Sequence, residues 1–171
     1  ARFQLATWDS LVERAEKKFY EDWVMIAESD IFNVLTIPFI SGNPEQALVR
    51  PRTVVITERI AKKYFGLEDP LNRTLTLWGN PVEVTGVIQN CPKNTHLRYD
   101  IIVSLNGFED VWNLDNWGWT GFYAYVKLKP HVDPSLFEQK IRHVADRYIS
   151  EELKEWGESF TFFLQPITSI H

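Results

Sequence analysis

The sequence predicts a domain of mixed α and β structure, and three stretches of the chain support this prediction. Residues 53–66 join a run of β-branched residues to an amphipathic helical pattern. Residues 74–88 alternate apolar and polar side chains on either side of a turn, which is typical of a hairpin. Residues 133–156 carry the longest helical pattern, with strand-like segments before and after it. We therefore expect an α+β domain whose helices pack against a shared sheet.

The composition is that of a folded domain that does not bind nucleic acid. The 171 residues include 11 Phe, 7 Trp and 6 Tyr, and a chain of this length buries about 70% of the surface that its unfolded form exposes. The net charge of −5 argues against nucleic acid, which requires a clustered basic surface. Cys91 has no second cysteine with which to pair. No stretch approaches the roughly 20 apolar residues of a membrane span, and the start at Ala1 has neither an initiator Met nor a signal-peptide core. We interpret the chain as an excised soluble piece.

The elements before residue 53 are short. Residues 24–26 predict a strand, and Ser29 or Asp30 is suited to cap one or two helical turns after it. A turn follows at Gly42-Asn43-Pro44, where the proline fits the first position of a small helix that ends at Leu48.

Residues 53–66 form the clearest unit. Thr53–Ile56 predicts a buried strand, Thr57 caps a helix, and Gly66 ends it as a left-handed C-terminal cap. One stripe of this helix is apolar, and the lysines lie on the other face. The stripe consists of Ile60, Ala61, Tyr64 and Phe65.

A hairpin is predicted next. Residues 74–78 and 82–88 alternate in period two around Gly79-Asn80, and Gly86 is a candidate bulge. Residues 99–105 then predict a further strand.

The last third predicts a β-α-β unit. A strand over residues 122–128 is followed by a helix with Asp133 as cap and Pro134 at its first position, and we expect this helix to continue to about Trp156. Residues 160–164 predict the closing strand. The buried stripe of the helix consists of Phe137, Ile141, Val144 and Tyr148.

Motifs for catalysis, cofactors or metals are absent from the sequence. The four histidines have no metal-ligand spacing, and no phosphate-binding loop or G-x-S-x-G motif occurs. Neighbouring carboxylates such as Glu21-Asp22 and Glu151-Glu152 lie in polar stretches, where they are interpreted as solvated charges. We therefore expect no catalytic, cofactor-binding or metal-binding residue. The histidines are His96, His131, His143 and His171.

The loop of residues 106–121 is unusual because it combines aromatic rings with Gly, Asn and Asp. Its rings are candidate contacts for a protein or a glycan, since Trp is enriched in interface hot spots. The alternative is that they fold back as a lid on the core, which the high average burial of Trp favours. The candidate contact residues are Phe108, Trp112, Trp117 and Trp119.

An ordered series of motifs runs from residue 29 to residue 171. Residues 54–66 read V-V-I-T-E-R-I-A-K-K-Y-F-G, residues 68–75 read E-D-P-L-N-R-T-L, and residues 91–96 read C-P-K-N-T-H. The series also includes S-D-I-F-N-V at 29–34, P-F-I-S-G-N-P at 38–44, V-T-G-V-I at 84–88 and Q-P-I-T-S-I-H at 165–171. In this order the motifs resemble those of the extracytoplasmic core domain of MacB-like (FtsX-type) ABC transporter permeases, especially the group common in Bacteroidetes-type bacteria. Asn72 stands where that family usually has Gly, and it tolerates the left-handed turn that such a position needs.

The resemblance implies a periplasmic domain of an inner-membrane protein, lying between its first two membrane helices. It implies two lobes: a porter-like lobe of residues 1–41 and 97–171, and a smaller inserted lobe of residues 42–96. It implies no catalysis in this domain, because ATP hydrolysis belongs to an ATP-binding subunit that acts through the membrane part. The domain would transmit motion across the membrane for export or for activation of a partner. A second permease copy and a periplasmic protein are the other implied partners.

A binding module is the alternative function. A secreted or periplasmic domain could recognise a glycan or a protein through exposed rings of Trp112, Trp117 and Trp119. An enzyme would instead need a cleft that contains displaced pKa values.

Overall fold

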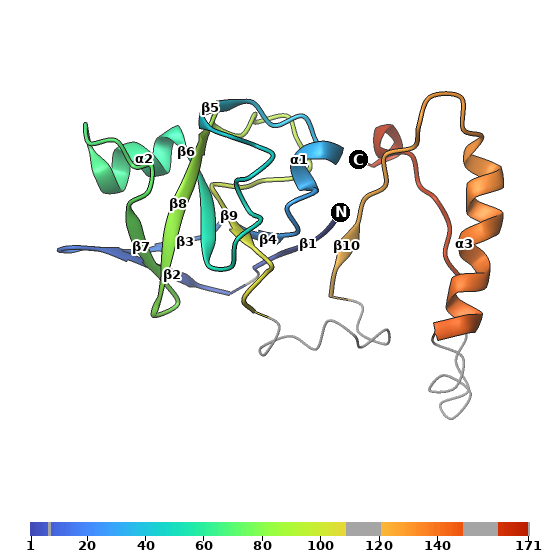
Figure 1. Ribbon diagram of the computed structural model, residues 1–171, viewed down its shortest axis with the longest axis horizontal. Coiled ribbons are helices and arrows are strands. Elements are labelled where there is room, and N and C mark those ends of the chain that lie inside the picture. The colour runs from blue at the N-terminus through green and yellow to red at the C-terminus, as the bar shows by residue number, and fades with distance from the viewer. Residues whose placement is uncertain (7, 109–120, 149–160, 171) are drawn as a thin grey trace. The chain divides into compact units, whose positions relative to one another are not determined.

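The structure is a computed structural model that describes residues 1–6, 8–108, 121–148 and 161–170 (Figure 1). The chain divides into two compact units. The first comprises Ala1–Trp112 and Phe122–Tyr125, and the second comprises Asn113–Gly121 and Val126–His171. The division into lobes at residues 41/42 and 96/97 is a different partition of the chain, and it stays a prediction.

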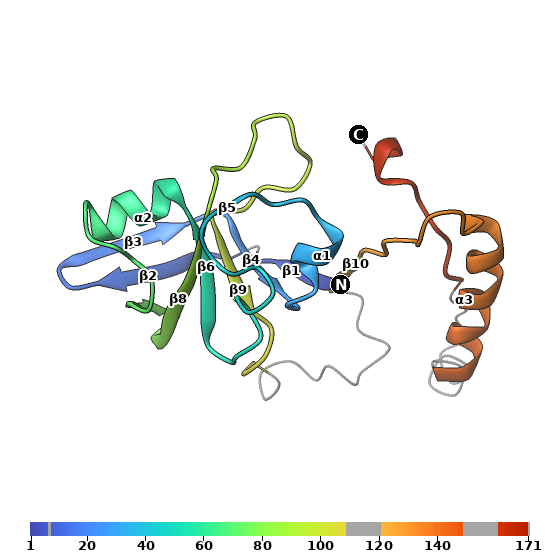
Figure 2. The same ribbon diagram turned by 45° about the horizontal axis from the view of Figure 1, so that its top comes forward.

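Among the described residues, ten strands of the first unit form one mixed sheet (Figures 1 and 2). Its order is β10-β1-β4-β9-β6-β8-β7-β2-β3, and β5 pairs with β8 outside this path. The pairs β4–β9 and β6–β8 are parallel, and the other pairs are antiparallel. The strands are β1 (Arg2–Leu5), β2 (Ser10–Arg14), β3 (Lys17–Glu21), β4 (Val24–Ala27), β5 (Phe39–Gly42), β6 (Thr53–Thr57), β7 (Thr74–Leu77), β8 (Asn80–Ile88), β9 (Ile101–Ser104) and β10 (Tyr123–Ala124). This mixture of strands and helices confirms the predicted fold class.

The core lies around the three central strands. Every residue of β4, β6 and β9 is buried, as expected where both faces of a strand are covered. Helix α1 (Ile31–Val34) contributes the buried Ile31, and helix α2 (Glu58–Phe65) packs on β6 and β8. The second unit contains α3 (Pro134–Tyr148) and the short 3-10 helix η1 (Ile167–Ser169).

Two turns show how local backbone chemistry determines the fold. The β7–β8 hairpin turns at Trp78 and Gly79, with φ of 51° and 77°, and Leu77 pairs with Asn80. A two-residue turn of this type needs positive φ at both positions, so the predicted turn lies one residue too far along the chain. Asn72 has φ of 58°, which confirms the left-handed turn expected there.

Strand β8 contains a bulge next to the predicted position Gly86, at Thr85. Val54 pairs with Val84 but Val55 pairs with Gly86, so one residue of β8 is left over opposite β6. A Cβ atom at Gly86 would lie 2.6 Å from the ring of Phe39. Glycine therefore lets β5 approach β8 closely.

The predicted strand over residues 122–128 is shortened to β10. Tyr123 pairs with Phe3, Ala124 pairs with Arg2, and the Tyr125 N–H donates to Ala1 O at 2.9 Å. Residues 125–129 carry no regular structure, so the strand is shorter than predicted.

The predicted closing strand is wrong for its described part. Residues 161–164 carry no regular structure, and the Leu164 N–H donates to Glu138 Oε2 of α3 at 3.2 Å instead of to a sheet. The expected cap of α3 is confirmed, because Asp133 Oδ1 accepts the Ser135 N–H at 2.9 Å. The stripe of α3 is only half-buried, and Tyr148 is 51% exposed, so its expected burial is not met. The predicted helix end near Trp156 lies outside the described residues.

Two differences concern the first half of the chain. Residues 44–49 form turns rather than the small helix expected after Pro44. The strands β1, β2, β3 and β5 were not predicted. The β2–β3 hairpin turns at Ala15, with φ of 51°, and Glu16, so it lacks the Asn or Gly that signals a turn.

Candidate functional site

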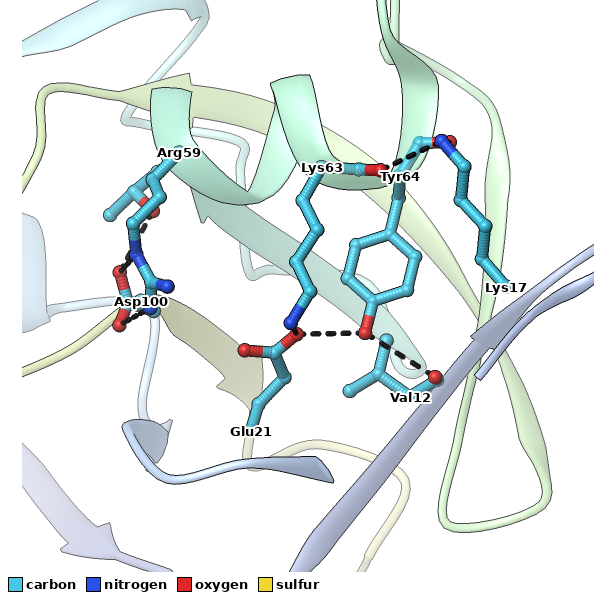
Figure 3. A network of polar contacts seen from close by, with 8 residues as sticks. Val12, Lys17, Glu21, Arg59, Lys63, Tyr64 and Asp100 are labelled. Carbon is cyan, nitrogen blue, oxygen red and sulfur yellow. Dashed lines mark hydrogen bonds and ion pairs between the residues drawn. The ribbon is translucent and has the colours of Figure 1, made fainter. Parts of the chain in front are cut away.

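Helix α2 carries polar side chains that reach into the first unit (Figure 3). Arg59 and Lys63 are four residues apart, so they project from the same side of the helix. Ile60, Tyr64 and Phe65 form its buried face and fix the helix on the sheet. The charged side chains therefore have definite partners on neighbouring strands.

The first partner is Glu21, at the end of β3. Its side chain is 4% exposed, and its Oε1 lies 2.6 Å from Lys63 Nζ and 2.8 Å from the Tyr64 hydroxyl (Figure 3). The same hydroxyl lies 3.3 Å from Val12 O. Burial, followed by the hydrogen bond to Glu21, raises the pKa of Tyr64 far above its ordinary value. Tyr64 is thus a permanent donor to the carboxylate.

The second partner is Asp100, which directly precedes β9. Arg59 contacts both of its carboxylate oxygens, with Nε 3.2 Å from Oδ1, and the Thr57 hydroxyl donates to Oδ1 at 3.1 Å. The hydrogen bond to Asp100 raises the pKa of Arg59. Thr57 has the extended backbone of a cap residue, but its hydroxyl donates to Asp100 and makes no capping hydrogen bond to α2. The Asn90 side chain accepts the Arg59 N–H at 2.9 Å in its place.

The C-terminal end of α2 is held by cations from the β2–β3 hairpin. Lys17 Nζ donates to the carbonyl oxygens of Lys63 and Tyr64 at 2.7 and 3.1 Å. Arg14 donates to the Tyr64 carbonyl at 3.1 Å, and its guanidinium carbon lies 4.2 Å from the centre of the Phe65 ring. Cations at this end complement the helix dipole and satisfy its free carbonyl groups.

We call the two groups around Glu21 and Asp100 the α2 clamp. Both carboxylates are buried, and each is matched by a cation and a hydroxyl. Such pairing makes the removal of one partner costly, because a buried charge is then left alone. The arrangement favours a helix fixed rigidly to β3 and β9. The members of the α2 clamp are Glu21, Lys63 and Tyr64, and Thr57, Arg59 and Asp100.

Glu21 was interpreted from the sequence as a solvated charge, and this is wrong. Its neighbour Asp22 is exposed, but Glu21 points inward because its partners Lys63 and Tyr64 lie beneath β3.

The candidate contact residues of the 106–121 loop divide into two groups. Phe108 is 7% exposed and packs edge-to-face on Trp78, with ring centres 5.9 Å apart, so it is not part of an exposed patch. Trp112, Trp117 and Trp119 lie outside the described residues, and their role stays a prediction.

The described residues contain no metal-ligand cluster and no membrane-spanning helix. Within the described ranges, no three or more His, Cys, Asp or Glu side chains gather as a metal site would require. None of the helices in the described part has the length and apolar character needed to cross a bilayer.

Tyr125 marks the point where the chain leaves the first unit. Its hydroxyl lies 2.8 Å from His96 Nε2, and its ring packs edge-on against Phe3 at 4.9 Å. Its carbonyl accepts a hydrogen bond from the Ala1 nitrogen at 2.8 Å. His96, which closes the C-P-K-N-T-H motif, therefore helps to fix the end of β10.

Comparison with known proteins relates the chain to extracytoplasmic parts of transporters. The profile of the MacB-like periplasmic core domain family matches residues 4–144. A solved domain of a protein assigned as a permease in Porphyromonas gingivalis is 22% identical, with a TM-score of 0.72 over 90% of this chain and 71% of that one. No curated protein matches the chain.

Two further solved structures share the fold. The periplasmic region of MacB from Actinobacillus actinomycetemcomitans is 15% identical, with a TM-score of 0.61 over 95% of this chain and 77% of that one. The extracellular domain of the noncanonic ABC-type transporter YknZ from Gram-positive bacteria is 18% identical, with a TM-score of 0.59 over 96% and 80%. At these identities the likeness establishes the fold.

Proposed function

The chain belongs to the family of MacB-like periplasmic core domains, and from this premise we propose that it transmits conformational change across the membrane without catalysing a reaction itself. Members of this family are periplasmic domains of ABC transporter permeases, which locates the chain outside the cytoplasm. The proposed output is export of a substrate or activation of a partner protein.

The α2 clamp is the observation that supports this proposal. A domain that transmits motion must move as a body rather than deform when a force reaches it. Two ion pairs, each with a buried carboxylate, tie α2 to β3 and to the start of β9, so a shift of the helix would leave Glu21 or Asp100 buried without its cation. Since both carboxylates are neutralised by cations, the clamp is suited to rigidity rather than to acid-base chemistry.

The proposed partners follow from the same premise. An ATP-binding subunit supplies the energy and acts through the membrane part of the full-length permease. A second permease copy faces the first, and a periplasmic protein is the third partner. Each copy of the domain then moves relative to the other when ATP binds and is hydrolysed.

Spin labels can separate movement between domains from deformation within one. Leu67, two residues after α2, and Ile40, on β5, are both exposed and lie in the same unit. The protein is the full-length permease with its ATP-binding subunit, in which Cys91→Ser removes the native thiol of this domain. One variant carries a label at Leu67→Cys, and a second carries labels at Leu67→Cys and Ile40→Cys. Pulsed electron paramagnetic resonance then measures distances with and without ATP.

ATP should change the distance between Leu67 labels on two copies and leave the Leu67–Ile40 distance within one copy unchanged. An unchanged distance between copies would contradict transmission. A change within one copy would contradict movement as a rigid body.

A further inference from the structure

A pocket of about 300 Å³ opens in the first unit where β1 ends and β4 begins. Its floor is apolar and consists of Leu5, Ala6 and Val24, of which Ala6 and Val24 are joined by a backbone hydrogen bond of 2.8 Å. This volume is at the lower end of the range for small-molecule sites. The rim consists of Trp8, Asp9, Asp22, Trp23 and Arg98.

The aromatic part of the rim is accessible. Trp8 and Trp23 are 42% and 41% exposed, although rings of this size are usually buried. The Arg98 guanidinium carbon lies 5.3 Å from the centre of the Trp23 ring. An indole of this pocket thus already holds a cation on its face, as cation–π attraction predicts.

The charged part of the rim has an excess of negative charge. Asp9 and Asp22 are both exposed, and neither forms a hydrogen bond or an ion pair with any residue in the described ranges. Two carboxylates and one guanidinium therefore line the rim. The guanidinium lies over the Trp23 ring, and Asp22 also interacts electrostatically with Arg59, whose charge is paired with Asp100. The rim has capacity for one further positive charge.

We propose that this pocket binds a small organic cation that carries an apolar body. The apolar body lies on Leu5 and Val24, and the cationic group lies between the exposed indoles and the two carboxylates. An anion of the same size is disfavoured by Asp9 and Asp22. Binding here is independent of the proposed function, because it requires neither ATP nor a second copy of the domain.

Nuclear magnetic resonance on the 171-residue chain tests this proposal. The probes are benzyltrimethylammonium, phenylmethanesulfonate as an anion of similar size, and tetramethylammonium as a cation without an apolar body. The indole N–H resonances of Trp8 and Trp23, assigned by Trp→Phe substitution, report binding. Asp22→Asn removes a rim charge, and Glu45→Gln is the matched control, since Glu45 is exposed and distant in sequence from the pocket.

Benzyltrimethylammonium should shift both indole resonances saturably, and the other two probes should bind more weakly. Asp22→Asn should weaken its affinity roughly threefold to fivefold, the range expected for one exposed charge pair, while Glu45→Gln should leave it unchanged. Equal binding of the sulfonate would overturn the assignment of charge. Equal binding of tetramethylammonium would overturn the role of the apolar floor. No saturable shift with the aromatic cation would remove the site altogether.

Discussion

Removing the cation from Glu21 should cost more stability than removing the charge of Glu21 itself. In Lys63→Met the carboxylate stays buried at 4% exposure without its ammonium partner. Breaking a buried pair in this way costs about 3–5 kcal/mol. Lys63 is itself 29% exposed and Tyr64 still donates to the carboxylate, so we expect the lower end, about 3 kcal/mol. For a chain of this length that loss lowers the Tm by about 6–12 °C.

Glu21→Gln changes the same contacts without leaving a buried charge. The amide oxygen can still accept the Tyr64 and Lys63 hydrogen bonds, and the ammonium of Lys63 can turn toward water. We expect a loss of about 1–2 kcal/mol, the value of weakening one charged hydrogen bond. The double variant should recover part of the loss of Lys63→Met, since both charges are then absent.

Urea unfolding at pH 7, followed by far-ultraviolet circular dichroism, measures all three free energies. Lys18→Met is the control, because Lys18 pairs with Glu13 on the surface and is 66% exposed. Its unfolding midpoint should change much less than that of Lys63→Met. The reasoning is refuted if Glu21→Gln costs as much as Lys63→Met, or if the two losses simply add in the double variant.

Three further predictions follow from other parts of the molecule. Gly86→Ala should destabilise the domain by about 1–3 kcal/mol, because its Cβ would meet the Phe39 ring; an unchanged urea midpoint would show that β5 can move away. The hydrogen bonds from Arg142 and the Leu164 N–H lower the pKa of Glu138 below its usual 4.5. The contact between Glu138 and the Leu164 N–H should therefore be complete above pH 4.5 and be lost as the pH falls through the lower pKa of the folded state. The Leu164 amide resonance should report a midpoint below 4.5 that disappears in Glu138→Gln, and a midpoint at or above 4.5 would contradict the contact. In the 106–121 loop, Trp→Ala should cost about 3–5 kcal/mol at a core ring and little at a partner contact, so loss of stability at every position would rule out the contact. The three positions are Trp112, Trp117 and Trp119.

The parts of the fold that the sequence predicted are those whose causes are local. The helix α2 is bounded by Thr57 and Gly66 and carries its own apolar stripe, so ten neighbouring residues determine it. The left-handed Asn72 likewise follows from the residue at its position. Features of this kind can be predicted without knowing which distant segment packs against them.

The candidate site could not be predicted in the same way. Glu21 is buried because Lys63 and Tyr64, 42 and 43 positions away, lie beneath it. The pairing partner of β10 is β1, more than 100 positions earlier. No local sequence pattern indicates contacts between residues so far apart in the chain. The hairpin at Ala15 also lacks the Asn or Gly that marks a turn. The site therefore depends on pairings that only the folded chain reveals.

The direction of a force applied to β10 determines how β10 would separate from β1. Because β1 and β10 are antiparallel, Ala1 and Tyr125 lie at the same end of the pair. A load applied between them acts on one hydrogen bond at a time, as in opening a zipper, rather than on the whole ladder at once. The contacts that His96 and Phe3 make with Tyr125 reinforce the first bond in that sequence. The mechanical strength of this junction is thus concentrated in one tyrosine.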